Sequence, residues 1–231
     1  MHFIDFRRHV CLALSLVAAL MLHGCATFGK EYSASNISRI ELGKTSRAQI
    51  VALFGSPQEE STTTYKKDVG DKDLPQPIIA TILRYYFSAP SASGAVAGSP
   101  PNRWLNVLLV DDATFAYFSS SSFKEDPTDF DVAKAGGFER GKTTKDMVVS
   151  TLGAPSGKGI YPFAVSAKGT GYFYSVDLKN MPPGSTTHKR VRVFFNPEDI
   201  VEDFSVNANT EAMPIAPVPV TIPVYIPSGK K

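Results

Sequence analysis

The stretch GKTSRAQIVALFGSP, residues 43–57, decides the fold because the chain repeats it as GKTTKDMVVSTLGAP at residues 141–155. Six of the fifteen positions are identical, and the two copies begin 98 residues apart. A self-match at a fixed offset indicates a repeated structural unit. The sequence therefore predicts a tandem duplication.

Each copy predicts one short helix with both ends specified. In the first copy Ser46 is placed to cap the amino terminus, and Gln49 completes a capping box three residues later. Thr144 takes the capping place in the second copy, where Met147 replaces the glutamine. A glycine in the left-handed conformation should end each helix, and a proline two residues later prevents its continuation. The residues of this structural motif are Gly43, Thr45, Ser46, Gly55, Pro57, Gly141, Thr143, Thr144, Gly153 and Pro155.

Residues 1–24 are typical of an export signal, with two arginines ahead of a thirteen-residue apolar run. That run is short for a transmembrane helix, which needs about twenty apolar residues. Residues 22–25, LHGC, resemble the lipobox of bacterial lipoproteins, which implies cleavage before Cys25 and acylation of this cysteine. Ala26 follows in place of the aspartate of an inner-membrane retention signal, so the expected location is the periplasmic face of the outer membrane. The alternative is an uncleaved anchor, or ordinary secretion with Cys25 free.

The rest of the chain divides into four segments. They are a tether at 25–34, a first unit at 35–123, a second unit at 127–207 and a proline-rich tail at 208–231. Each unit should hold a short helix, the capped helix and several strands, in that order. The expected short helices lie at 35–40 and 128–134, and the expected strands at 79–87, 104–110, 114–120, 160–166, 171–176, 190–195 and 200–206. Residues 65–76 and 91–101 are expected to be loops, and the tail an extended or polyproline II rod.

These capped helices, each followed by antiparallel strand candidates, resemble the BamE (SmpA/OmlA) lipoprotein domain. The resemblance implies a helix pair on one face of a three-stranded sheet, in a lipoprotein of the β-barrel assembly machinery. A tandem of such units is similar to the β-lactamase inhibitor protein, whose halves each pack a helix pair on a four-stranded sheet. The expected fold class is α+β, with two tandem units that each pack a short helix pair on one face of a three- to four-stranded antiparallel sheet.

Aromatic residues concentrate on the expected strands. A sheet covered by helices on one side leaves its other face open, and alternate strand residues point toward that face. Tyrosine there suits protein–protein contact, because its ring buries area while its hydroxyl stays hydrated. We expect the partner face to include Tyr85, Phe87, Trp104, Tyr172 and Tyr174. The alternative is that most of these residues belong to the core.

Two other patterns indicate structure and not chemistry. Residues 136–143, GGFERGKT, match the phosphate-binding loop pattern, but no strand precedes them and the first copy lacks the first glycine. Lys44 and Lys142 are therefore expected to be solvated turn residues. His188 is the only histidine after the signal, and no Cys/His cluster accompanies it. We expect no cofactor, no metal and no bound nucleotide.

The chain holds 24 Lys+Arg against 22 Asp+Glu with no basic run, so nucleic acid is not an expected partner. The function that fits best is that of a lipid-anchored lipoprotein, not an enzyme, which binds or scaffolds another envelope protein in outer-membrane biogenesis. Its partners would be the membrane, through N-terminal acyl chains, and that envelope protein. One alternative is a proteinaceous inhibitor of a periplasmic or secreted enzyme, and a second is a hydrolase that uses His188.

Overall fold

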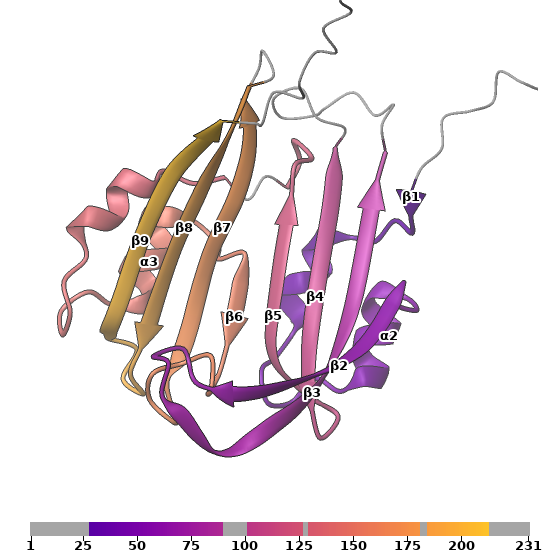
Figure 1. Ribbon diagram of the computed structural model, residues 1–231, viewed down its shortest axis with the longest axis horizontal. Coiled ribbons are helices and arrows are strands. Elements are labelled where there is room, and N and C mark those ends of the chain that lie inside the picture. Colours follow the sequence, from indigo (N-terminus) through magenta and orange to yellow (C-terminus); the bar gives the residue numbers. More distant parts are fainter. Residues whose placement is uncertain (1–27, 90–100, 127–128, 181–183, 213–231) are drawn as a thin grey trace, which may run out of the picture.

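The computed structural model of the chain describes residues 28–89, 101–126, 129–180 and 184–212. Within them, nine strands form one antiparallel sheet in the order β1-β3-β4-β5-β6-β7-β8-β9, and β2 also pairs with β3 (Figure 1). The strands are β1 (Phe28–Gly29), β2 (Glu59–Lys67), β3 (Asp73–Ser88), β4 (Asn102–Val110), β5 (Ala113–Ser121), β6 (Gly157–Gly159), β7 (Thr170–Asn180), β8 (Ser185–Phe195) and β9 (Val201–Ala212). Four short helices accompany them in the described residues: η1 (Ala34–Arg39), α2 (Arg47–Phe54), η2 (Val132–Gly137) and α3 (Lys145–Leu152).

The expected fold class, two units with separate sheets, is wrong. β6 pairs with β5 at residues 116–118 and with β7 at residues 171–173, so both halves share one sheet. Glycine allows β6 to lie this close to β5, because a Cβ on Gly157 would lie 2.8 Å from the Tyr117 carbonyl oxygen. A three-residue strand with glycine at both ends has little β propensity, so the sequence does not reveal it.

Two other expected elements differ in the structure. Residues 160–166 form turns and bends instead of a strand. Residues 65–76, expected to be a loop, contain the end of β2 and the beginning of β3. The pairing runs from Glu59 opposite Arg84 to Lys67 opposite Asp73. The polar sequence of β2 hides a strand because most of its residues remain exposed or half-buried.

The Gly-Lys-Thr turn of each motif attaches its helix to a strand of the sheet. The Gly43 N–H donates to the Thr114 carbonyl (2.7 Å), and the Thr114 N–H donates back to the Thr45 carbonyl (2.8 Å). The second motif makes the same two bonds to Val201, each 2.8 Å long. Both turn glycines have a φ of 75°, which L side chains rarely adopt. The Gly-Lys-Thr part of each motif thus forms a turn that is hydrogen-bonded to the sheet.

The helix caps explain the serine and threonine of the motif. The Gln49 N–H donates to the Ser46 hydroxyl (3.3 Å), and the Ser46 N–H donates to the Gln49 side-chain oxygen (2.8 Å), which completes the capping box. The Met147 N–H donates to the Thr144 hydroxyl (3.2 Å) without a reciprocal bond from its own side chain. The closing glycine of α2, Gly55, combines φ of 82° with ψ of −168°, and that of α3 is nearly the same. The expected left-handed helical ψ is therefore wrong, although the positive φ still favours glycine.

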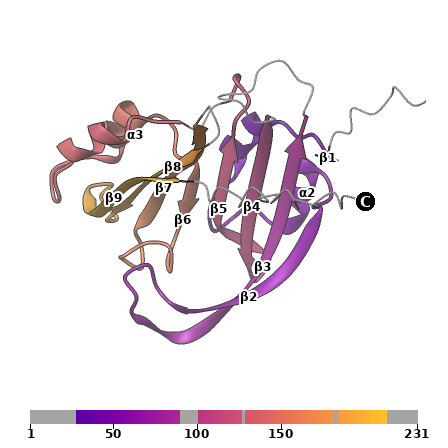
Figure 2. The same ribbon diagram turned by 45° about the horizontal axis from the view of Figure 1, so that its top comes forward.

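Each pair of helices covers its own core on one face of the sheet, and Figure 2 shows α2 on the side of β3–β5 and α3 on the side of β7–β9. Ile50 and Phe54 of α2 are buried against β3, β4 and β5. Val148 of α3 is buried against β7, β8 and β9. The Tyr85 hydroxyl donates to the Gly55 carbonyl, and the Tyr174 hydroxyl donates likewise at the end of α3, both at 3.1 Å. One tyrosine from the sheet thus satisfies the end of each helix.

Candidate protein-binding surface

The structure places most of the expected partner face under the helices. Tyr85 and Tyr174 are 2% exposed and Phe87 is 6% exposed, all on the helix-covered side. Tyr172 is half-buried against the second core. Only Trp104 of the five lies on the open side, opposite Tyr86 in the pairing of β3 with β4. As an outward face the expected set is therefore wrong for Tyr85, Phe87, Tyr172 and Tyr174.

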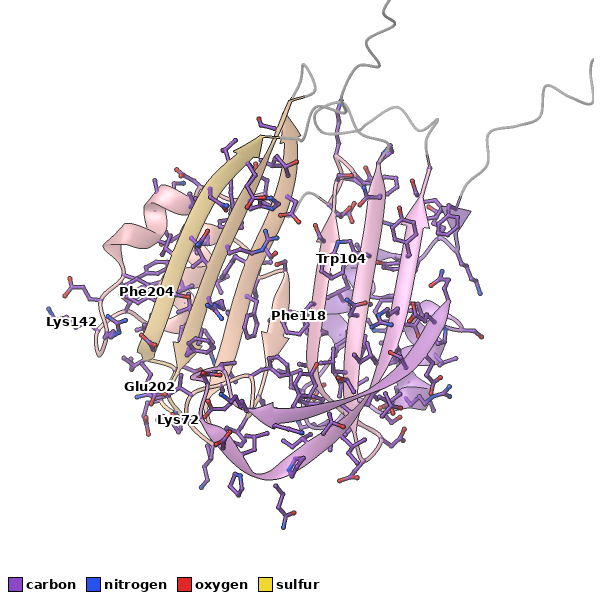
Figure 3. All side chains as sticks on the ribbon, viewed as in Figure 1. Lys72, Trp104, Phe118, Lys142, Glu202 and Phe204 are labelled. Atoms are coloured by element: carbon purple, nitrogen blue, oxygen red, sulfur yellow. The ribbon has the colours of Figure 1, made fainter. Side chains whose placement is uncertain are left out.

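A different set of aromatic residues lies on the open face. Figure 3 shows Trp104 and Phe118 on the side of the sheet away from the helices. The Phe118 ring contacts that of Phe173 edge to face, with centroids 5.1 Å apart. Phe28 in β1 is 69% exposed and packs edge to face on Tyr86 at 5.4 Å. The strand sequences YYF (85–87) and YFY (172–174) place aromatic rings on both faces of the sheet. A shift of one residue in the alternation therefore decides which rings point outward.

A third core covers one end of this open face. The β2–β3 ribbon crosses in front of the sheet in Figure 1. Tyr65 of the ribbon contacts Phe163, with centroids 5.2 Å apart, over the buried side chains of Leu108 and Ala116. Residues 160–166, expected to form a strand, thus help to cover this end of the open face. The ribbon leaves the other end of the face open.

A groove of about 560 Å³ occupies that open end across β5, β7, β8 and β9. Its lining combines aromatic residues with arginine, serine and asparagine. The lining residues are Phe118, Phe173, Tyr174, Ser175, Arg190, Arg192, Ser205, Asn207 and Asn209. Such a mixture of aromatic and arginine side chains is typical of the energetically important part of protein interfaces.

The two arginines of the groove differ in their partners. Arg190 donates to Asp177 (2.6 Å) and to the Val176 carbonyl (2.9 Å). Arg192 donates from Nε to the Ser205 hydroxyl (3.2 Å) and forms no ion pair with any carboxylate that the structure describes. Its charge is therefore available to a ligand.

The hydrolase alternative depends on His188, which lies on β8 opposite Asp177 of β7. Its Nδ1 is 2.6 Å from Asp177 Oδ1, and its Nε2 is 3.8 Å from Glu211 Oε2. Burial raises the pKa of Asp177, but hydrogen bonds from His188 and Arg190 outweigh it and leave that pKa below its usual 3.8. Both ring nitrogens thus face carboxylates, and no hydroxyl or thiol in the described residues is hydrogen-bonded to His188. The geometry is that of an ion-pair cluster.

The phosphate-loop pattern at 136–143 has no strand before it, because its first two residues are the end of η2. The Lys142 side chain is 76% exposed and pairs with Glu139 at 2.6 Å, and the Lys44 side chain is 77% exposed and pairs with Glu41 at 3.1 Å. Both lysines are solvated, as expected. Within the part of the chain that the structure describes, no group of three or more potential ligands could hold a metal ion.

Several expectations lie outside the described residues. Cys25, the export signal, residues 91–100 of the expected loop and the tail from residue 213 belong to this group. Of the helices in the described ranges, none has the length and apolar character needed to span a bilayer.

Comparisons with known proteins add one likeness. No family model matches the sequence, so the resemblance to the BamE domain has no support from a family match. No curated protein matches it either. A crystal structure described as a "putative beta-lactamase inhibitor protein" from Streptococcus mutans is similar over 77% of this chain and 98% of that one, with 13% identity and a TM-score of 0.40. A score this low does not assign the two chains to one fold, and no functional argument follows from it.

Proposed function

We propose that the chain binds another envelope protein across the open face of its sheet, while acyl chains on Cys25 hold it at the periplasmic face of the outer membrane. The lipobox-like residues 22–25 support the anchor. The groove across β5, β7, β8 and β9 supports the binding face. The chain would then act as a tethered binding or scaffolding module.

The observation that carries the proposal is the unpaired charge of Arg192 beside the Phe118 and Phe173 rings. A guanidinium without a carboxylate, next to apolar surface, favours a partner that presents an acidic side chain beside an apolar one. Flat aromatic rings supply area at a low entropic cost, because each ring has only two rotatable side-chain bonds. Charge complementarity therefore selects an acidic polypeptide as the occupant.

The test is photo-crosslinking in cells from the two faces of the sheet. A photoreactive residue at Trp104 or Phe118 samples the open face, and one at Met147, which is 53% exposed on α3, samples the helix face as a matched control. We expect one protein to be captured from the open face and not from Met147. Recovery of lipid or peptidoglycan alone from the open face would overturn the proposal, as would equal capture from Met147.

A charge reversal sharpens the same experiment. Arg192→Glu should reduce capture from Phe118 by roughly tenfold or more, since like charges would then face each other. Lys142→Glu, at an exposed turn that does not line the groove, should leave capture unchanged. If the captured partner is an enzyme, its activity with an equimolar amount of the chain separates the inhibitor alternative from scaffolding. Unaltered enzyme activity would exclude inhibition.

A further inference from the structure

A second cavity lies on the opposite side of the sheet, between the two pairs of helices. Its volume is about 440 Å³, within the range of small-molecule sites. η1 forms one wall, and residues 152–156 after α3 form the other. The floor is the seam of the sheet, where β5 meets β6. This cavity shares no residue with the open-face groove and is independent of the function proposed above.

Two polar side chains stand next to each other on this floor. Tyr117 of β5 and Lys158 of β6 are direct partners in the antiparallel pairing, so their side chains emerge together on the helix side. In the described part of the chain the Lys158 side chain forms no hydrogen bond and no ion pair, and its ammonium lies 5.1 Å from the centre of the Tyr172 ring. Neighbouring Lys145 approaches the same ring at 5.7 Å but is paired with Asp199. Of these two lysines, Lys158 is the one that has no carboxylate partner in the described residues.

The Tyr117 hydroxyl is also unpaired, yet it is not sealed in the core. Only the hydroxyls of Tyr32 and Thr170 are both sealed and unpartnered among the described residues. Tyr117 lines the cavity, and its hydroxyl has no hydrogen-bond partner in that part of the chain. The ammonium and the phenol come from paired positions and supply two hydrogen-bond donors at the floor of the cavity.

The other charges of the cavity are already neutralised. Asp126 accepts two hydrogen bonds from Arg103, at 2.8 and 2.9 Å. Asp129 pairs with Lys189 at 2.7 Å. A single positive charge therefore remains, and it calls for one negative charge on a ligand.

Much of the remaining wall is apolar, and six serines complete the lining. Ala34 and Ile37 of η1 face Leu152, Ala154 and Pro155 across the cavity. Pro155 belongs to the repeated motif, so the end of the second helix also shapes this site. The wall would accommodate a hydrocarbon group of a few carbon atoms next to the charged floor.

We propose that this cavity binds a small carboxylate with an apolar substituent, its oxygens held by Lys158 and Tyr117. Burial and the charge of Lys145 lower the pKa of Lys158, and a bound carboxylate would oppose this shift. Two sources carry this chemistry: a free fatty acid of short chain, or the carboxyl terminus of a polypeptide that ends in an apolar residue.

The test is calorimetric titration of the full chain with octanoate, with N-acetyl-leucine and with N-acetyl-leucinamide. We expect the two carboxylates to bind and the amide not to bind. Tighter binding of octanoate would indicate a free acid, and tighter binding of N-acetyl-leucine a polypeptide terminus. Lys158→Met should weaken the carboxylates by about tenfold or more, because a charge-assisted hydrogen bond is lost. Lys142→Met is the matched control and should bind normally.

Three results would overturn the proposal: no binding of either carboxylate, equal binding of the amide, or unchanged binding by Lys158→Met. Circular dichroism shows whether the variant is folded. If it is not, Tyr117→Phe decides alone, with an expected weakening of about threefold or more. Unchanged carboxylate binding by a folded Tyr117→Phe would then reject the site.

Discussion

Replacement of Asp126 by alanine should destabilise the protein strongly. Arg103 of β4 has a side chain that is 8% exposed, and the Asp126 side chain is 20% exposed. The guanidinium donates to both carboxylate oxygens, and its third nitrogen donates to the Tyr32 carbonyl at 2.6 Å. It also lies 4.7 Å from the centre of the Phe123 ring. Asp126→Ala would remove both carboxylate hydrogen bonds of this buried cation and leave only Glu125, whose side chain is 66% exposed and lies 3.8 Å away.

Loss of one partner from a buried ion pair costs about 3–5 kcal/mol of unfolding free energy. Because Asp126 retains some contact with solvent, we expect the lower end, about 3 kcal/mol. With a typical urea slope of about 1–3 kcal/mol per molar, the unfolding midpoint should fall by roughly 1 M or more. Asp126→Asn should cost about half as much, since the amide oxygen still accepts one hydrogen bond.

The assay is urea unfolding followed by circular dichroism and by fluorescence of Trp104, the only tryptophan in the chain. Arg103→Met and the double variant complete a cycle. The double variant should be less destabilised than the sum of the single ones, because it leaves no unpaired charge. A loss below about 1 kcal/mol in Asp126→Ala, or strict additivity in the cycle, would refute this reasoning.

Three smaller predictions concern the repeated elements. Ser46→Ala should cost about 1 kcal/mol of unfolding free energy, and Met147→Gln, which supplies the missing half of a capping box, should add about 0.5 kcal/mol; unchanged urea midpoints would contradict both. Tyr85→Phe should cost about 1 kcal/mol of unfolding free energy. Tyr174→Phe should cost less, because Gly153, whose carbonyl accepts from Tyr174, is exposed and water can replace the lost donor. The reverse order in urea unfolding would be inconsistent with this account. Burial raises the pKa of Tyr85 from 10.0 to about 12, so its contribution is complete below pH 10 and is lost as the pH rises toward 12; phenolate absorbance and circular dichroism should show this tyrosine ionising as the protein unfolds, not in the native state.

The sequence predicts the locally determined features of the fold well. The caps at Ser46 and Thr144 follow from side-chain chemistry within one helical turn, and both are present. The expected strands 104–110 and 114–120 leave only a short connection between them, and in the structure Asp111 and Asp112 form it with positive φ. These features depend only on neighbouring residues, so no knowledge of the rest of the chain is needed.

The features that depend on distant partners are not predicted. β6 is a strand only because β5 and β7 lie on either side of it, and its sequence GKG gives no sign of that. Periodicity does not identify the rings of the open face, because three consecutive aromatic residues on β3 and on β7 leave the phase of each strand undetermined. Tyr85 is directed inward by its bond to the end of α2, which periodicity does not reveal. The groove and Arg192 therefore required the assembled sheet.

β6 also has a consequence for communication across the molecule. The groove that contains Phe118 and the cavity that contains Lys158 lie on opposite faces of the sheet, and both border this three-residue strand. A bend of the sheet along this line would widen the site on one face while it narrows the site on the other. By thermodynamic reciprocity, a ligand that prefers one curvature would alter the affinity of a partner on the opposite face by the same factor as that partner alters the affinity of the ligand.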